Sequence, residues 1–377
     1  MVLKETKFNL IIVFLVASSS LFSCSRVKED NEEMTYSFEI EKDNVFIDIP
    51  STTSPNLTYP VLWDSLGDEY FAAYNFQVHG LDIFNLSQRR YVKQVKFSTE
   101  GPDFVSSVQA ISIWSEGIFL VVNDAYITLV NFAGRVIDRL SINAESSDFT
   151  GFDFSSGRLL VNRHSGLQFS GRQKTILMEA YRFAGDSNLG QGFVLVELDI
   201  ENRTIGVVDI PYESSLLNVE ESYGELNGLN FLKLENKLVL NHKFSSEVFI
   251  WKGGKLQSRN VLSSFTVNEI QPFSRANGVT RESRQEYELK SSKFFPLVFD
   301  PNRDLYYRLH RSQLENINDQ ADFYITVMDV DFQKIGELLF PEGYYIFPIV
   351  SREGLLFLAF NKHDDRVELL NINVQLN

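Results

Sequence analysis

Short apolar runs separated by polar turns recur along most of this chain. The runs are rich in Val, Ile, Phe, Tyr and Leu, and they are bounded by Gly, Asn, Asp and Pro. Long stretches with the 3.6-residue period of an amphipathic helix are scarce, whereas short runs of branched and aromatic residues are typical of strands. The pattern therefore predicts an all-β protein.

The runs form six copies of one pattern. Each copy has an apolar strand, a polar turn and a second strand that ends in a polar residue, and five copies continue with two further strands. The first two strands of the copies are 61–63 and 70–75, 111–113 and 118–123, 152–154 and 158–162, 229–231 and 237–241, 296–298 and 305–310, and 346–348 and 355–361. This repeat predicts a six-bladed β-propeller. The alternative is a β-sandwich with additional hairpins.

The sixth copy lacks a fourth strand. It ends with a third strand at residues 367–374, whereas residues 36–49 alternate apolar and polar positions ahead of the first copy. A strand at 36–49 would fill the gap and cover two open sheet edges. We therefore expect the N-terminal strand to close the ring of a propeller that extends over residues 35–377.

The first 34 residues have a different pattern. Lys4 and Lys7 precede an uncharged apolar core at residues 8–16, and small residues then lead to Leu21-Phe22-Ser23-Cys24. A basic start and a short apolar core are typical of a secretory signal, and the core is shorter than the roughly 20 apolar residues of a spanning helix. The motif resembles a bacterial lipobox, although Phe22 is bulkier than most lipoboxes carry. It implies a signal peptide at 1–23 and lipidation of Cys24. The alternative is an ordinary secretory signal with an incidental cysteine.

Residues 24–34 form a polar, acidic segment that we interpret as a flexible tether. Its lysine followed by acidic residues resembles the export signal of surface lipoproteins in the Bacteroidota. We expect a lipid anchor at the cell envelope, in the outer membrane and exposed at its surface. Since Cys24 is the only cysteine, its lipidation would leave the exported domain without a disulfide.

The formal net charge of −15 disfavours nucleic acid as a partner. The segment Asp300-Pro301-Asn302-Arg303-Asp304-Leu305-Tyr306-Tyr307-Arg308, the lipobox and the six-copy layout together resemble the uncharacterised six-bladed propeller lipoproteins of the Bacteroidota. The resemblance implies the fold and brings no activity with it.

All five histidines follow the predicted second strand of a copy, at positions 79, 164, 242, 310 and 363. In a propeller, the connections between second and third strands emerge on the same face as the connections between blades, and we call this face the top face. Segments 162–192 and 271–293 belong to it, and each carries more basic than acidic residues. Within the second segment, Ser283-Arg284-Gln285-Glu286 predicts the start of a short helix.

These positions predict a ligand-binding top face. Basic side chains there would donate hydrogen bonds to the carboxylate or sulfate of an acidic glycan or peptide, or would contact an envelope protein. The candidate residues are Arg163, His164, His242, Lys243, Arg308, His310, Arg311, Lys362 and His363. The alternative is that polar residues at strand ends serve only as turn formers and solvated caps.

The sequence contains none of the common catalytic motifs or phosphate-binding glycine loops. We therefore expect a non-enzymatic binding scaffold that has no cofactor and no catalytic residues. The alternative function is a polysaccharide lyase or hydrolase whose metal ion is held by His164, His242 and His310. Those three residues lack the close spacing of a strong metal motif.

Overall fold

The computed structural model describes most of the chain from residue 38 onward. Residues 1–37, 116, 124, 143–146, 154–156, 161–167, 171–173, 183–191, 209, 211–220, 224–225, 227, 275–279, 361–364 and 377 lie outside the described part. The chain divides into two units, Met1–Ser37 and Phe38–Asn377, and only the second is described here. None of the helices in the described part is long and apolar enough to span a membrane.

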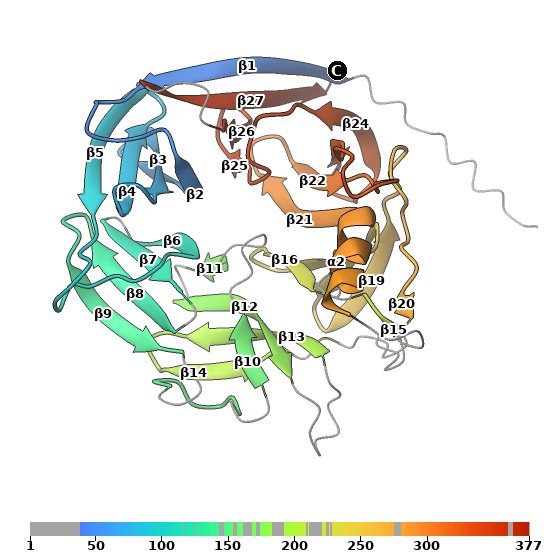
Figure 1. The fold of residues 1–377 in the computed structure, drawn as a ribbon, viewed down its shortest axis with the longest axis horizontal. Helices are drawn as coiled ribbons and strands as arrows, with labels where there is room; N and C mark the ends of the chain where they lie inside the picture. The colour runs from blue at the N-terminus through green and yellow to red at the C-terminus, as the bar shows by residue number, and fades with distance from the viewer. Residues whose placement is uncertain are drawn as a thin grey trace, which may run out of the picture. The chain divides into compact units, whose positions relative to one another are not determined.

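Six antiparallel sheets of four or five strands follow one another around a ring in the described part of the second unit (Figure 1). The first three blades consist of β2 (Leu57–Ser65), β3 (Asp68–Asn75), β4 (Gly80–Asn85) and β5 (Arg90–Lys96); β6 (Ala110–Ser115), β7 (Ile118–Val122), β8 (Tyr126–Asn131) and β9 (Val136–Ser141); and β10 (Gly157–Leu160), β11 (Gln168–Ser170), β12 (Thr175–Arg182), β13 (Gly192–Asp199) and β14 (Thr204–Val207).

The last three blades consist of β16 (Leu229–Lys233), β17 (Leu238–His242), β18 (Glu247–Lys252) and β19 (Lys255–Asn260); β21 (Lys293–Asp300), β22 (Leu305–Arg311), β23 (Phe323–Met328) and β24 (Lys334–Phe340); and β25 (Ile349–Val350), β26 (Leu355–Leu358), β27 (Arg366–Leu376) and β1 (Phe38–Asp48). The predicted six-bladed β-propeller is therefore confirmed.

The sixth sheet joins the two ends of the described chain. Its strand order is β25, β26, β27 and β1. β1 runs antiparallel to β27, with register from Phe38 opposite Leu376 to Asp48 opposite Arg366. Alternation along β1 buries Val45 and Ile47, and continues to the buried Ile49 just after it, so one side of this outer strand packs into the protein.

The hydrophobic core lies between neighbouring blades. A separate cluster of buried side chains fills each of the six interfaces, including the one between the sixth and first blades. There, Phe71 of β3 stacks on Phe84 of β4 with ring centroids 4.4 Å apart, in the same cluster as Leu356 of β26. Burial of facing sheet surfaces is the main stabilisation expected for such an architecture.

The third blade differs from the prediction. Its second strand is β12, which lies inside the segment 162–192 that we expected to be a top-face loop. β10 overlaps the predicted second strand, 158–162, but it pairs with β12 from the first-strand position, and the short β11 pairs with the same edge of β12. His164 lies outside the described residues, and along the chain it comes before this second strand rather than after it.

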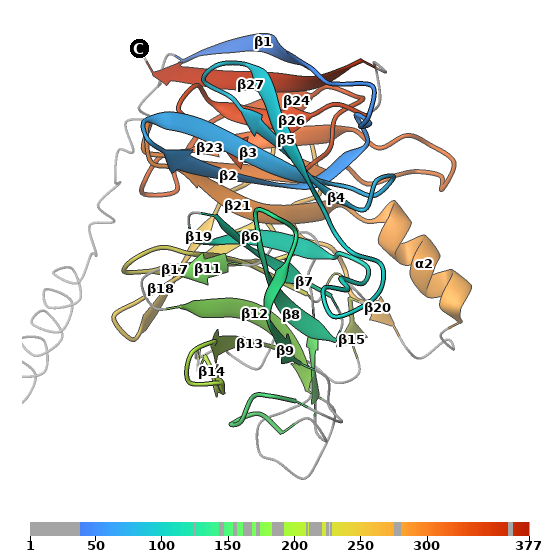
Figure 2. The ribbon, with the colours of Figure 1, turned by 90° about the vertical axis from the view of Figure 1, so that its left-hand side faces the viewer.

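One helix in the described part, α2 (Arg281–Lys290), precedes the fifth blade and projects from one side of the ring (Figures 1 and 2). Its N-cap is Thr280, which forms a capping box with Ser283, so the helix begins three residues earlier than the predicted N-cap at Ser283 implied. The short strands β15 (Glu221–Ser222) and β20 (Phe273–Ser274) pair nearby.

Candidate functional site

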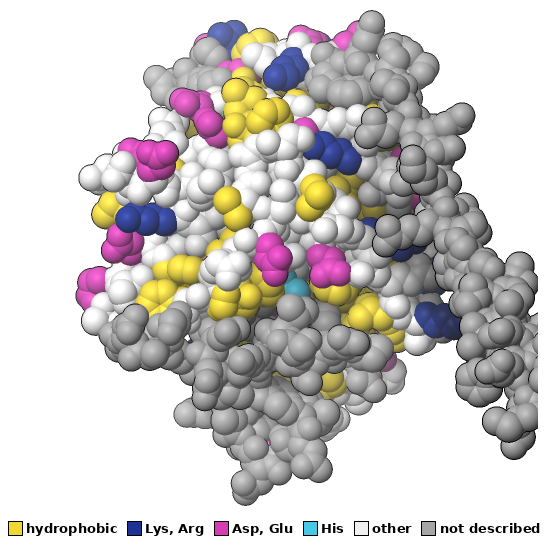
Figure 3. All heavy atoms as spheres, turned by 90° about the vertical axis from the view of Figure 1, so that its right-hand side faces the viewer, with side chains coloured by type: hydrophobic (Ala, Val, Ile, Leu, Met, Phe, Trp, Pro, Cys, Tyr) yellow, Lys and Arg dark blue, Asp and Glu magenta, His cyan; other side chains and the backbone are white. Residues whose placement is uncertain are grey.

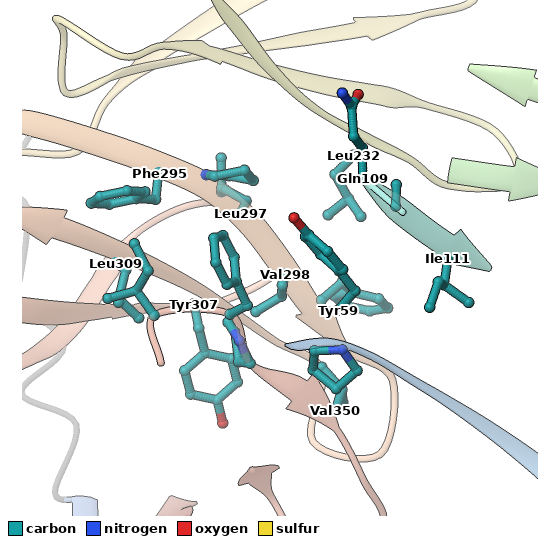
Figure 4. A pocket seen from close by; sticks show the side chains of 17 residues that line it. Tyr59, Gln109, Ile111, Leu232, Phe295, Leu297, Val298, Tyr307, Leu309 and Val350 are labelled. Atoms are coloured by element: carbon teal, nitrogen blue, oxygen red, sulfur yellow. The ribbon is translucent and has the colours of Figure 1, made fainter. Parts of the chain in front are cut away.

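A cavity of about 320 Å³ lies among the inner strands of the propeller. Its wall comes from five blades, through β2, the start of β6, β16, β21 with β22, and the start of β25 (Figure 4). The chain enters each inner strand from the connection between two blades. Tyr59, Gln109 and Pro348 lie at or just before the starts of inner strands, whereas Leu232 and Phe299 lie near the ends of theirs, so the cavity extends along the inner strands.

The wall of this cavity is largely apolar, in part because prolines occupy the free edges of the inner strands. An inner strand has a neighbour on only one side, so its other edge presents unpaired backbone groups to the channel. Pro60 and Pro296 lie in inner strands, and Pro348 directly precedes another. Proline has no N–H group, so these positions present no backbone donor. Apolar side chains such as Leu297 and Val298 complete the wall.

Tyr59 is held in the cavity wall by a strained backbone. Its φ angle is 53°, in the left-handed region that non-glycine residues rarely adopt. The register between β2 and β3 shifts between Thr58 and Val61, which marks a β-bulge around Tyr59 and Pro60. Bulges redirect side chains, and a strained residue of this kind costs about 1–3 kcal/mol. The local irregularity therefore accompanies the placement of the Tyr59 ring in the wall.

Two polar groups in this wall are available to a ligand. Figure 4 shows the Tyr59 hydroxyl at the far end of its ring, near Leu232, while the Gln109 carboxamide points away from Tyr59. Within the described residues, neither the Tyr59 hydroxyl nor the Gln109 carboxamide forms a hydrogen bond. A hydroxyl and a carboxamide supply both donors and acceptors, so the site combines apolar surface with two groups that can orient a bound molecule.

The candidate residues at the end of β17, His242 and Lys243, pack against neighbouring side chains. The His242 side chain is buried, and its ring stacks on Phe244 with centroids 4.8 Å apart. A Cβ added to Gly228 would lie 2.5 Å from Lys243 Nζ and 3.2 Å from Glu179 Oε1, so both charged groups lie above this glycine. Glu179 also accepts a 2.8 Å hydrogen bond from the Leu229 N–H. Lys243 is thus placed beside a buried carboxylate.

Arg308 and His310 do not reach the surface. Both are fully buried in β22. The Arg308 guanidinium donates hydrogen bonds of 2.8 Å to the carbonyl oxygens of Ser246 and Val261 in the fourth blade. These contacts join two blades, which makes Arg308 a structural residue rather than a ligand contact in this conformation. Burial lowers its pKa to about 9.

His310 belongs to a buried polar group around Glu337 of β24. His310 Nε2 lies 2.8 Å from Glu337 Oε1, which also accepts a 2.6 Å hydrogen bond from the Ser263 hydroxyl. Lys334 Nζ lies 2.5 Å from the other carboxylate oxygen. These bonds lower the pKa of Glu337 although its burial alone would raise it. The group links the fifth blade to the loop that follows the fourth.

Arg311 stabilises the end of helix α2. Its Nη2 donates to the carbonyl oxygens of Glu288, Leu289 and Ser291, at 2.8, 3.1 and 2.7 Å. The last carbonyl groups of a helix have no intrahelical partner, so a cation there satisfies them and interacts favourably with the helix dipole. Arg311 therefore orients α2, and burial lowers its pKa.

The remaining predicted residues lie outside the described residues. They are Cys24, Arg163, His164, Lys362 and His363. Among the residues that are described, no group of three or more His, Cys, Asp and Glu side chains could hold a metal ion. His79, which was no candidate, connects the first blade to the next segment, because its ring nitrogens lie 2.8 Å from Tyr74 Oη and from the carbonyl oxygen of Val105.

Charges on the outer side of the ring are mixed. On the side formed by the blades at the right of Figure 1, acidic and basic side chains are interspersed with hydrophobic ones (Figure 3). The predicted site consists of histidines and basic residues at strand ends, whereas the cavity is lined mainly by the first strands of the copies. Their prolines and aromatic residues, as in Phe295-Pro296 and Phe347-Pro348, were the signal for the cavity.

Comparison with known proteins places the fold in a group. The family model described as a domain of unknown function, DUF4221, matches residues 35–339. A solved structure of a DUF4221 family member from Bacteroides vulgatus is similar with a TM-score of 0.68 and 15% identity, covering 91% of this chain and 100% of that one. A protein from Bacteroides fragilis is similar with a TM-score of 0.53 and 10% identity, covering 89% and 95%. No curated protein matches the chain.

Proposed function

This chain belongs to the DUF4221 family, and we propose that it is a lipid-anchored, non-enzymatic binding protein of the bacterial cell envelope. Its propeller takes part of a ligand into the central channel. The observation that carries this proposal is the cavity of about 320 Å³ with its apolar wall. Small-molecule sites are typically concave, mostly apolar and provided with a few oriented polar groups.

Two of the basic candidates already form hydrogen bonds within the protein, which favours the channel as the binding site. Arg308 and Arg311 donate to carbonyl oxygens within the protein, so we assign ligand recognition to the channel rather than to these charges. Lys243 is partly exposed on the top-face side of its blade. It would contact the portion of a glycan, a peptide or an envelope protein that extends beyond the cavity, where its charge favours an acidic group.

Binding in the channel is tested with prodan, a neutral naphthalene ketone whose emission shifts to the blue in apolar surroundings. The propeller domain is titrated with prodan, alongside the variants Leu232→Trp and Leu339→Trp. Leu232 lines the cavity, so tryptophan there occupies its space, whereas Leu339 is 54% exposed on β24 and serves as the matched control. We expect saturable one-to-one binding that Leu232→Trp abolishes and Leu339→Trp preserves. Equal emission from all three proteins would exclude the channel site.

The anchor is tested separately through Cys24. We expect the wild-type protein to incorporate an alkyne-labelled fatty acid and to sediment with membranes. The Cys24→Ser variant would incorporate none and would leave the membrane fraction. Incorporation of label by Cys24→Ser would contradict lipidation at this residue, and membrane association of the unlabelled variant would indicate another mode of attachment. Protease accessibility on intact cells then tests surface exposure.

A further inference from the structure

The size of the channel cavity limits what can enter it. A volume of about 320 Å³ is at the lower end of the range for small-molecule sites. A one-ring or two-ring molecule, or a ring-containing end of a larger one, is of suitable size.

The chemistry of the wall limits charge. The described lining residues are aliphatic, aromatic or proline, together with Gln109 and the hydroxyl of Tyr59, and none of them carries a carboxylate, imidazole, ammonium or guanidinium group. A charge moved from water into such surroundings loses its hydration without gaining an opposite charge, which is strongly unfavourable. The wall therefore favours a neutral guest.

The polar groups of the wall add a positional requirement. Tyr59 lies in the first blade and Gln109 just before the first strand of the second blade, and both line the same cavity (Figure 4). The bulge fixes Tyr59 in a left-handed conformation before Pro60, so little further ordering is needed when a ligand binds. A guest with one hydrogen-bond acceptor can receive the Tyr59 hydroxyl while its rings contact Leu232 and Val298.

We propose that the channel selects a ligand whose inserted part is uncharged, contains a ring and carries a neutral hydrogen-bond acceptor, and that Tyr59 is the residue that recognises this acceptor. The proposal rests on the proposed function and narrows its ligand class. It predicts that affinity falls when the acceptor is removed from the ligand, when the Tyr59 hydroxyl is removed, or when a charge is added to the ligand.

Three matched probes test the proposal by displacement of prodan from the propeller domain. Benzophenone has two rings and a carbonyl acceptor, diphenylmethane has the rings without the acceptor, and 4-benzoylbenzoate adds a carboxylate. We expect benzophenone to bind about threefold to tenfold more tightly than diphenylmethane, as one net hydrogen bond implies. We expect 4-benzoylbenzoate to bind at least about tenfold more weakly than benzophenone.

The Tyr59→Phe variant isolates the hydroxyl. It should bring the affinity of benzophenone down to that of diphenylmethane and leave diphenylmethane unchanged, whereas Tyr126→Phe, at a 39% exposed position on β8, should change neither. Prodan is itself a ketone and should also bind more weakly to Tyr59→Phe, so a circular-dichroism spectrum like that of the wild type checks that the variant is folded. Ultraviolet irradiation of bound benzophenone should attach it to peptides that contain residues 295–299 or 109–111.

The outcomes separate this inference from the proposed function. Equal affinities for benzophenone and diphenylmethane in the wild type, or an unchanged preference in Tyr59→Phe, would overturn the role of Tyr59. Tighter binding of 4-benzoylbenzoate would overturn the neutral ligand class. In each of these cases prodan would still bind in the channel, and the proposed function would stand. Loss of all binding, prodan included, would exclude both.

Discussion

His310 Nε2 lies 2.8 Å from Glu337 Oε1, and the two side chains are 0% and 3% exposed. Burial lowers the pKa of His310, and the positive charges of Arg308 and Lys334 lower it further, against the raising effect of Glu337. The imidazole is therefore neutral at neutral pH, with Nε2 facing the carboxylate and Nδ1 3.4 Å from the Thr266 hydroxyl. His310 thus acts as an uncharged hydrogen-bonding member of a structural cluster.

Acid should destabilise the protein through His310. Because its pKa is lower in the folded than in the unfolded chain, the unfolded chain binds the proton first as pH falls below the ordinary value of 6.5. The stability present at neutral pH is therefore lost toward acid. We expect the free energy of unfolding to fall less between about pH 7.5 and about pH 5.5 in His310→Gln than in the wild type. Urea unfolding at both pH values measures the difference, and a wild type that gains stability toward acid would contradict it.

Arg308 should contribute to stability rather than to ligand binding. Its replacement by methionine removes both hydrogen bonds to the fourth blade and leaves the carbonyl oxygens of Ser246 and Val261 buried without a donor. We expect a loss of about 3 kcal/mol in the free energy of unfolding. Arg89→Met is the control because the Arg89 side chain is 52% exposed, and its effect should stay within about 0.5 kcal/mol. Prodan binding by folded Arg308→Met should match the wild type.

Most strands of the propeller could be predicted from local pattern, and the exceptions have physical reasons. Alternation around Val45 and Ile47 was sufficient to place a strand near the N terminus, and this strand pairs with β27. Strand β12 was not predicted because residues 175–180 are all buried, so the segment lacks the alternation of apolar and polar residues that marks a half-buried strand. Glu179 within it looks like a loop residue, yet its carboxylate accepts the N–H of Leu229, 50 positions along the chain.

The candidate site was less predictable because it depends on distant contacts. Arg308 is a basic residue within the predicted strand 305–310, and basic residues are typically exposed. Its burial depends on carbonyl oxygens 62 and 47 positions away. The cavity likewise combines the first strands of several copies. A single copy shows their apolar character, but only the ring brings Tyr59, Leu232 and Pro296 to one wall.

The Tyr307 hydroxyl should contribute little to stability. It is buried and has no hydrogen-bond partner among the described residues, and burial raises the pKa of the phenol. Tyr307→Phe removes a desolvated polar group, so we expect a change in the free energy of unfolding between zero and a gain of about 1 kcal/mol. Tyr344→Phe is the contrast, because the buried Tyr344 hydroxyl donates a 2.7 Å hydrogen bond to Glu368. We expect that variant to lose about 1–2 kcal/mol. Equal losses in thermal or urea unfolding would refute the distinction.

Adjacent residues of β1 should differ strongly in their contribution to the core. Ile47 is fully buried, in the cluster between the sixth and first blades, whereas the Phe46 side chain is 41% exposed on the opposite side of the strand. Truncation of a buried isoleucine loses its transfer free energy and leaves a cavity, so Ile47→Ala should lower the free energy of unfolding by about 3 kcal/mol. Phe46 contacts Arg366, whose Cζ lies 4.6 Å from the ring centroid, and Phe46→Ala should lose about 1 kcal/mol or less.

Urea unfolding of both β1 variants measures how firmly this strand is held. Because the two positions share one strand and one pairing with β27, a general weakening of the strand would affect them equally. A large loss confined to Ile47→Ala would therefore indicate that side-chain packing between the sixth and first blades stabilises the N-terminal strand. Small and equal losses would mean that β1 contributes little to the core, and the propeller would then depend on β27 alone to cover that edge.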